Sequence, residues 1–314
     1  MHRRLRIAIC LMVSTLVALG IVMVYSASAL YAAETTGHPW SLLLRHLLAL
    51  VVGVAGAAGV MSIPYQQLRR WSKPLVLMAW ALLVLVLLPG VGHQTGGAQR
   101  WFRCGAISVQ PSEIAQLIMI IYLSDALTRK QSALDRWWDG LAPVLCVLSL
   151  TLGLILLQPD LGTAVAISAV AGGLLFLTRV RWQHLATLGA AAVPALVVLI
   201  GSAGYRRRRI LAFLNPWGDP QGSGFQIIQS LIAIGTGGVF GVGLGHSTQK
   251  LFYLPGSYGD FMFAIIGEEL GLLGCLAVLL LFVGVLWCGA SLALHTPDLF
   301  GRAISVSAAG SSRP

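Results

Sequence analysis

Charge is scarce in this 314-residue sequence. Only 10% of the residues are charged and 11 are Asp or Glu, whereas 57% are hydrophobic and the mean hydropathy is +0.81. Soluble domains carry about 25% charged residues, so a soluble globular fold is excluded. Long apolar runs recur along the whole chain and predict an all-α polytopic membrane protein.

Cysteine-based sites and nucleotide-binding motifs are lacking as well. Four of the five cysteines lie in apolar runs, and Cys104 alone in a loop gives neither a disulfide framework nor a metal-ligand spacing. The glycine-rich stretch at 237–245 follows no expected strand, so its glycines are expected to allow tight turns or close backbone approach. The net charge of +10 comes from bases dispersed in short loops, which indicates membrane topology rather than nucleic-acid binding.

Apolar segments near the length of a membrane-spanning helix, about 17–25 residues, recur along the chain. These eight segments cover residues 7–29, 42–62, 75–89, 112–127, 141–157, 163–178, 185–201 and 261–293. Each is expected to be a helix, because lipid offers no partner to an open backbone. The first lacks a convincing cleavage site and is expected to be retained. The sequence thus predicts one membrane domain over 1–314, with a large loop at 202–260 and an atypical tail at 296–314.

Lys and Arg are distributed unevenly between the loops that precede the large loop. One side carries eleven of them, namely Arg3, Arg4, Arg6, Arg69, Arg70, Lys73, Arg129, Lys130, Arg136, Arg179 and Arg181. The other side carries three, namely Arg45, Arg100 and Arg103. The positive-inside rule then predicts a cytoplasmic N-terminus, an extracytoplasmic large loop and, with eight spans, a cytoplasmic C-terminus.

The short outer loops carry polar residues that fit either helix capping or a functional site. Ser112 and Glu113 follow Pro111 in the first turn of an expected helix, where backbone N–H groups need acceptors. Asp160 follows Pro159 in a tight turn and is expected to cap the next helix. Both interpretations stay open on these residues alone.

The large loop at 202–260 is too long and too patterned for a linker and is expected to be ordered and functional. Its segment at 225–234, which contains Gln229, predicts a short amphipathic helix. The four adjacent arginines Arg206–Arg209, together with Lys250, are either a solvated basic run or an anion site, because the Arg fork matches phosphate oxygens.

Three carboxylates stand at the end of this loop and in the last apolar run. Asp260 immediately precedes the run and is either a helix cap or a catalytic group. Glu268 and Glu269 lie two turns into it, where a carboxylate is costly unless it faces a cavity or a partner. Gly267 and Gly271 form a small-xxx-small pair that permits close packing.

Taken together, several stretches resemble the SEDS family of membrane glycosyltransferases, which includes FtsW and RodA. The matching stretches are GAQRW at 97–101, QPSE at 110–113, QPDLGT at 158–163 and the block 206–274. Within the block, NPWGDP at 215–220, GSGFQ at 222–226 and GLGHSTQKL at 243–251 are similar to the FtsW branch rather than to RodA. The resemblance covers the chain to about residue 293.

The resemblance implies a peptidoglycan glycosyltransferase that polymerises lipid II on the outer face of the bacterial cytoplasmic (inner) membrane, during septal cell-wall synthesis in division. Its partners would be a class B penicillin-binding protein and other divisome proteins. The family's essential carboxylate falls on Asp260 and its essential tryptophan on Trp101. A divalent cation, Mg²⁺ or Mn²⁺, is compatible with this chemistry, but the sequence specifies no ligand set for one.

Sugar transfer from a lipid pyrophosphate needs a base at the attacking hydroxyl and cations at the leaving group. The hypothesis assigns Asp260 as the general base. The residues expected to bind substrate are Trp101, Arg100, Arg206, Arg207, Arg208, Arg209, Lys250 and Gln229. Those expected to support the site are Glu113, Ser112, Asp160, Glu268 and Glu269.

Three features depart from the family pattern. The family reads Pro-Glu-x-His-Thr-Asp where this chain reads PGSYGD at 255–260, so the Asp is kept without its acidic and imidazole neighbours. Gln116 replaces a Lys that is common after the PSE motif. The family has ten spans, so the last two are expected to be missing after residue 293.

Two other functions fit the same residues. A lipid II flippase or transporter would also use buried acidic residues and a polar cavity, although no internal repeat is found in the sequence. The third hypothesis is an inactive scaffold that recruits a class B penicillin-binding protein. The expected loss of two spans favours this hypothesis.

Overall fold

A computed structural model describes residues 2–95, 98–104, 107–178, 180–251, 253–254, 256 and 258–295. The tail expected at 296–314, Arg179 and Gly97 lie outside these residues. The chain divides into two compact units. The first unit combines residues 3–53 with 191–285, and the second is built on residues 54–190.

Every expected membrane-spanning segment coincides with a helix. These helices are α1 (His2–Thr36), α2 (Ser41–Met61), α3 (Tyr65–Leu87), α4 (Pro111–Arg129), α5 (Ala142–Leu157), α6 (Leu161–Leu177), α7 (Trp182–Gly201) and α10 (Met262–Leu294). The protein is therefore an all-α polytopic membrane protein. Within the described residues, six helices are long and apolar enough to cross a membrane. Because α4 and the 17-residue α6 are not among them, the count of eight spans stays a prediction.

Further elements lie in the loops. They are the short helical turns η1 (Trp137–Leu141) and η2 (Pro216–Gly218), the helices α8 (Gly204–Leu214) and α9 (Phe225–Gly237), and the strands β1 (His93–Thr95), β2 (Ala98–Cys104) and β3 (Ile107–Val109). The helix expected at 225–234 is confirmed as α9. The antiparallel sheet, in the order β1-β2-β3, was not expected, because strands of three to seven residues are too short for their alternation to stand out.

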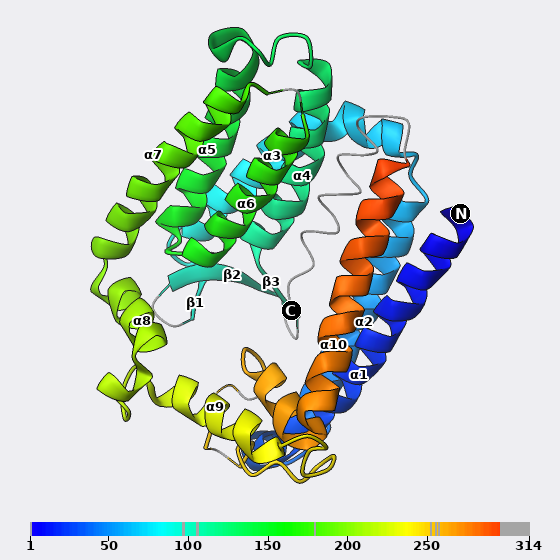
Figure 1. The fold of residues 1–314 in the computed structure, drawn as a ribbon, viewed down its shortest axis with the longest axis vertical. Helices are drawn as coiled ribbons and strands as arrows, with labels where there is room; N and C mark the ends of the chain where they lie inside the picture. Colours follow the sequence, from blue (N-terminus) through cyan, green and yellow to red (C-terminus); the bar gives the residue numbers. More distant parts are fainter. Residues whose placement is uncertain are drawn as a thin grey trace. The chain divides into compact units, whose positions relative to one another are not determined.

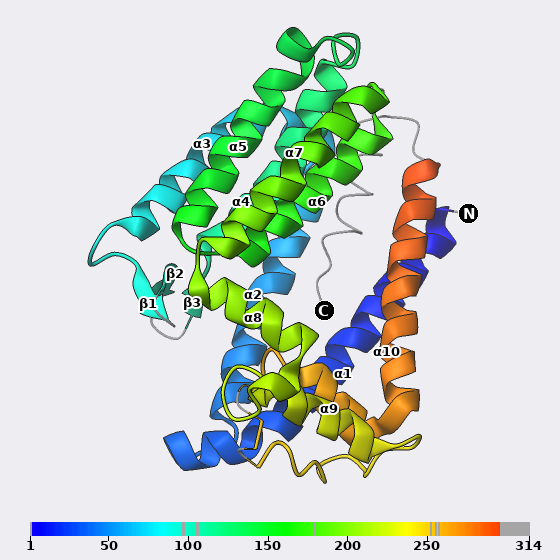
Figure 2. The ribbon, with the colours of Figure 1, turned by 60° about the vertical axis from the view of Figure 1, so that its left-hand side comes forward.

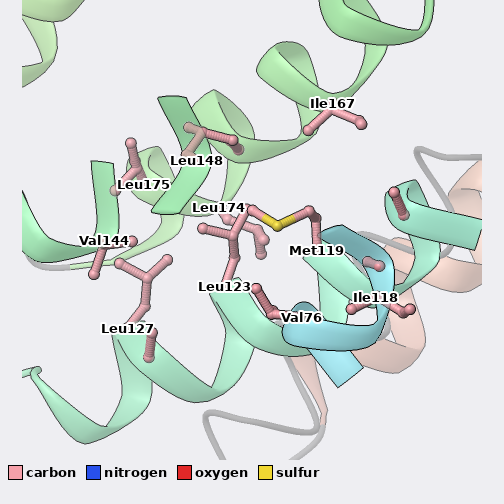
Figure 3. Close-up of a cluster of buried hydrophobic side chains, with 14 of the residues drawn as sticks. Val76, Ile118, Met119, Leu123, Leu127, Val144, Leu148, Ile167, Leu174 and Leu175 are labelled. Carbon is pink, nitrogen blue, oxygen red and sulfur yellow. The ribbon is translucent and has the colours of Figure 1, made fainter. Parts of the chain in front are cut away.

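In the second unit, helices α3, α4, α5 and α6 lie side by side around one apolar core (Figures 1 and 2). Figure 3 shows side chains of these helices gathered in the core, among them Val76 of α3, Leu123 of α4, Leu148 of α5 and Leu174 of α6. All four are at most 8% exposed. Because lipid is as apolar as leucine, van der Waals packing of this kind, rather than burial from water, holds such helices together.

A fully buried carboxylate, Asp125, joins α3 to α4 within the second unit. It accepts from Arg69 Nε at 3.0 Å and from Ser72 Oγ at 2.5 Å, and Arg129, one turn further along α4, forms a second ion pair. A buried carboxylate is costly unless it is paired and hydrogen-bonded, and here it is both. Nothing local in the sequence distinguishes Asp125 from an ordinary charge at a helix end, so its role becomes visible only in the structure.

In the first unit, α1 and α10 run alongside each other in both views (Figures 1 and 2). Met23 and Ala27 of α1 belong to one buried cluster with Ile265 and Val278 of α10. Leu254, from the loop that precedes α10, belongs to the same cluster and is 2% exposed. The apolar packing therefore ties the end of the large loop to the α1–α10 pair.

Helix α10 is interrupted at Gly271, where φ of 67° and ψ of −164° lie outside the helical region. The next two amides donate to carbonyls of the glycine-rich stretch at 237–245, at 2.9 and 3.2 Å. Two amides of that stretch donate back to the carbonyls of Glu268 and Glu269, at 2.9 and 3.0 Å. Backbone hydrogen bonds in both directions thus attach the stretch to the break in the helix.

Glycine is required at this attachment because the two backbones approach too closely for side chains. A Cβ atom at Gly237, Gly241 or Gly271 would overlap backbone atoms of the opposite segment. A Cβ at Gly267 would lie 3.0 Å from the side chain of Ile234 in α9. The predictions that these glycines allow close backbone approach and close packing are confirmed.

We predict that Gly271→Ala lowers the free energy of unfolding by about 1–3 kcal/mol, because alanine strains a positive φ and its Cβ meets the backbone of the glycine-rich stretch. Thermal unfolding of the detergent-solubilised protein measures the loss. Gly20→Ala in α1 is the control, since no atom lies within 4 Å of its Cβ position, and it should be neutral or stabilising. Equal melting temperatures for the two variants would contradict the requirement for glycine.

Candidate active site

Asp260 lies in an exposed turn, two residues before α10 begins. The turn is closed by hydrogen bonds from Gly259 N to Gly256 O at 2.9 Å and from Met262 N to Gly259 O at 3.2 Å. Among the described residues, no hydrogen-bond donor or cation contacts the Asp260 carboxylate. The structure therefore does not use Asp260 as the cap of α10, and its oxygens face solvent.

Glu268 is 1% exposed and holds the turn that follows the glycine-rich stretch. Its carboxylate accepts from Ser247 Oγ at 2.5 Å, from Thr248 N and Oγ1 at 2.8 and 2.9 Å, and from Gln249 N at 3.4 Å. Consecutive backbone amides in a turn form an anion-binding concavity. The Glu268 carboxylate occupies this concavity, so the anion bound there belongs to the protein itself.

Glu269 is also 1% exposed and is bound to Lys250 and to α1. Lys250 Nζ lies 2.8 Å from Glu269 Oε1, and Ser26 Oγ donates to the two carboxylate oxygens at 2.7 and 2.9 Å. Lys250 Nζ also donates to Ser26 Oγ at 3.1 Å. Lys250 was expected to bind substrate, but its side chain is 6% exposed and paired with Glu269, so that role stays a prediction.

The chain between this ion pair and Asp260 is fixed at two further points. Leu254 is inserted into the apolar cluster, and the Tyr258 ring stacks on Tyr31 of α1 with centroids 5.0 Å apart and planes at 29°. Burial and, secondly, a hydrogen bond with Tyr31 raise the pKa of the Tyr258 hydroxyl. The part of the loop that precedes Asp260 is therefore held to the apolar cluster and to α1.

Most carboxylates in the described part of the chain are occupied by internal contacts. Those that accept hydrogen bonds or form ion pairs are Asp125, Asp135, Asp139, Asp160, Asp219, Glu268 and Glu269. Glu34, Glu113 and Asp260 are exposed without such contacts. Of these three, only Asp260 belongs to the large loop, next to the anchored turn.

The arginine run lies on α8 and is mostly exposed. Arg206 Nη1 donates to the carbonyl of Leu199 at 2.8 Å, and the Arg209 guanidinium lies 4.6 Å from the centre of the Tyr205 ring. The other two arginines of the run are exposed. Four cations on one short helix, with one of them tied to the backbone, give the first unit a cationic surface that is free to bind an anion.

The expected substrate and support residues of the first unit separate into two groups. Lys250, Glu268 and Glu269 are brought together in the buried cluster. Gln229, half-buried on α9, has no hydrogen bond to Asp260 in the described part of the chain, and neither has the α8 run. Their roles in binding substrate stay predictions.

In the second unit, Arg100 reaches from β2 to the tight turn between α5 and α6. Its Nε donates to Gln158 O at 2.7 Å and its Nη2 donates to Pro159 O at 2.5 Å. These carbonyls at the end of α5 have no partner within the helix, and the Arg fork satisfies both. Part of the guanidinium is therefore committed to holding the turn.

Asp160 in the same turn is 7% exposed and caps α6. Its Oδ1 accepts from Thr163 N at 3.2 Å, and its Oδ2 accepts from Gln110 Nε2 at 2.9 Å and from Ser112 Oγ at 3.1 Å. The expected cap is confirmed. Ser112 was expected to serve the start of α4, but its hydroxyl instead links α4 to the α6 turn.

Trp101 and Glu113 stand apart from these contacts. Trp101 lies in β2 opposite His93 of β1 and is half-buried, whereas Glu113 is exposed in the first turn of α4. Nothing in the described second unit assigns either of them a substrate, so their roles stay predictions.

Sequence reasoning missed several residues of the buried cluster. Ser247 and Thr248 stand in the GLGHSTQKL stretch at 243–251, but a hydroxyl group in a loop does not indicate its partner. Ser26 lies in an apolar span 243 positions from Glu269, so no local pattern connects the two. A small polar residue inside an apolar span, in a chain with two glutamates in another span, was the available signal.

The described part of the chain gives no ligand set for a resident metal ion. Within the described residues, no group of three or more His, Cys, Asp or Glu side chains gathers in a way that could hold a metal ion. The carboxylates nearest to Asp260 in sequence are filled by hydroxyls, amides and Lys250. These residues do not fit a divalent-cation site.

Comparisons with known proteins agree along the length of the chain. A family model for FtsW, RodA and SpoVE, described as cell cycle protein, matches residues 6–310. Stage V sporulation protein E of Bacillus subtilis is 44% identical over 291 residues, which are 93% of this chain and 80% of that protein. A probable peptidoglycan glycosyltransferase FtsW of Trichlorobacter lovleyi is 42% identical over 303 residues, which are 96% of this chain and 80% of that protein.

A solved structure extends the similarity to the fold. It concerns the coordination of polymerization and crosslinking by a peptidoglycan synthase complex, and one of its chains matches with a TM-score of 0.75 and 33% identity. The match covers 96% of this chain and 82% of that chain.

We predict that Asp160→Ala lowers the free energy of unfolding by about 2–4 kcal/mol, because it removes the α6 cap and leaves the buried hydroxyl of Ser112 without its acceptor. Thermal unfolding measures the change. Glu113→Gln, which alters an exposed carboxylate on α4, is the control and should stay within about 0.5 kcal/mol of the wild type. An Asp160→Ala variant as stable as this control would refute the structural role.

Proposed function

The chain belongs to the FtsW/RodA/SpoVE family of cell cycle proteins, and from this premise we propose that it is a peptidoglycan glycosyltransferase that polymerises lipid II during septal cell-wall synthesis. A relative named probable peptidoglycan glycosyltransferase FtsW is 42% identical over 96% of this chain, which supports the enzyme class. The sequence similarity of GLGHSTQKL and its neighbours to the FtsW branch supports the division role. Another relative, 44% identical, is named for sporulation.

The observation that supports the proposal most strongly is the exposure of the Asp260 carboxylate and its lack of an internal partner among the described residues. Asp260 also stands on a turn fixed by Leu254 and Tyr258. A general base must be open to the substrate and held in place. Glu268 and Glu269, the other carboxylates of this region, are buried and occupied.

Asp260 acts as the general base in the proposed reaction. The acceptor sugar's 4-hydroxyl oxygen attacks the anomeric carbon of the donor, and Asp260 takes the proton of that hydroxyl. A new carbon–oxygen bond forms while the bond from the anomeric carbon to the lipid pyrophosphate breaks. The pyrophosphate leaves with the electron pair, so negative charge develops there and cations nearby lower the barrier.

The arginines of α8 are the proposed ligands of the leaving pyrophosphate. Arg207 and Arg208 are exposed, and the guanidinium fork binds phosphate oxygens in pairs. Lys250 is left out of this role, because its ammonium is buried against Glu269. Trp101 and Arg100 remain proposed contacts of the lipid-linked sugar.

The partner and location follow from the same chemistry. Polymerised strands must be crosslinked, and the similar solved structure is of a complex concerned with both steps. We therefore expect a class B penicillin-binding protein and other divisome proteins as partners, at the septum of the inner membrane. The outer face is the proposed side of the reaction, because the loop charges predict that the large loop is extracytoplasmic.

We predict that Asp260→Asn and Asp260→Ala reduce polymerisation of lipid II by at least about 100-fold, since general-base catalysis contributes roughly 10²–10⁴-fold. The assay measures glycan strands made by the purified protein with its penicillin-binding partner. Asp219→Asn is the matched control in the same loop, because the Asp219 carboxylate accepts hydrogen bonds from Gly222 and Ser223 of its own turn, away from Asp260 in the chain, and it should retain activity. Undiminished strand synthesis in Asp260→Ala would rule out the base assignment.

The same preparation separates the competing functions. Vesicles in which the wild-type protein moves labelled lipid II without extending it would indicate a flippase. Copurification with the penicillin-binding partner and no polymerisation by the wild type would indicate a scaffold.

A further inference from the structure

The loop that carries Asp260 is closed by side chains of the helix that follows it. The turn at 247–249 and Lys250 precede Asp260 in the chain, whereas Glu268 and Glu269 follow it. Glu268 binds the turn, and Glu269 binds Lys250. The two ends of the segment from Ser247 to Glu268 are thus bonded to each other. Closing a loop at its base removes much of its conformational freedom, which favours a fixed position for a residue within it.

Two further features make this closure strong. It is buried, with the side chains of Glu269 and Lys250 at 0% and 6% exposure, and a buried ion pair is screened little by salt or water. It also includes α1, since Ser26 Oγ contacts both Glu269 and Lys250. The ends of the loop are therefore tied to two helices at one point.

The geometry points to Lys250 and Glu269 as positioning residues, which set the place of Asp260 by locking the base of its loop to α1 and α10. This inference rests on the proposed function, in which Asp260 is the base. It replaces the role expected for Lys250 as a ligand of the leaving pyrophosphate. A positioning pair and a substrate cation differ in what their loss does to the reaction.

Loss of either partner should lower kcat while leaving the affinity for substrate in place. A displacement of about 1 Å at a catalytic group costs up to roughly 100-fold in rate. We therefore expect Lys250→Met and Glu269→Gln each to reduce kcat for lipid II polymerisation by about 10- to 100-fold, with KM within about twofold of the wild type. Asp139→Asn, which breaks the exposed ion pair with Arg136, is the control and should change neither constant.

The double variant Lys250→Met/Glu269→Gln provides the decisive measurement. If the two residues act as one unit, the double variant loses no more activity than the worse single variant. It also removes both charges, so it leaves no unpaired buried charge that could prevent folding. A raised KM in Lys250→Met alone, together with additive losses in the double variant, would overturn the inference. Lys250 would then be a residue that binds the substrate.

A readout that does not require activity completes the test. Limited chymotrypsin digestion of the full-length protein in detergent should cut at Tyr253 or Tyr258 faster in Glu269→Gln than in the wild type or Asp139→Asn, because the loop opens. Equal cleavage rates would overturn the inference. A wild type that resists cleavage but makes no glycan strands would instead refute the proposed function alone.

Discussion

The buried carboxylates of Glu268 and Glu269 are the constraint on which the first unit depends. A carboxylate inside an apolar helix is costly until every oxygen has a partner, so each draws polar groups toward α10. Glu268 accepts hydrogen bonds from a turn of the large loop. Glu269 forms an ion pair with Lys250 and accepts a hydrogen bond from Ser26 of α1. The ordered end of the loop is a consequence of satisfying these two groups.

The break in α10 at Gly271 makes the arrangement possible. An unbroken helix has no free amides to offer, whereas the positive φ at Gly271 directs two of them to the glycine-rich stretch. Glycines on both sides let the backbones meet, and the turn that binds Glu268 follows directly along the chain. Backbone and side-chain contacts therefore attach the same segment, so the closure does not depend on one interaction.

The carboxylates of the protein divide according to their surroundings. Asp125 and Asp160 join helices of the second unit, and Glu268 and Glu269 join the loop to helices of the first. Among the carboxylates of the large loop that the structure describes, Asp260 is exposed without an internal partner, on a turn closed by backbone hydrogen bonds, whereas the exposed Asp219 accepts hydrogen bonds within its own turn. This contrast, rather than any unusual residue beside Asp260, distinguishes the proposed base from the structural acids.

The sequence by itself determined the helices, because the cost of exposing backbone or charge to lipid acts on each segment separately and is read directly from apolar length. For the same reason it predicted α9, the cap by Asp160 and the close approach at the glycines, all of which depend on neighbouring residues. The tertiary structure alone decided the partners of Lys250, Ser26 and Asp125, as well as the small sheet. A partner such as Ser26, 243 positions from Glu269, is chosen by how whole helices pack, and no local pattern records that choice.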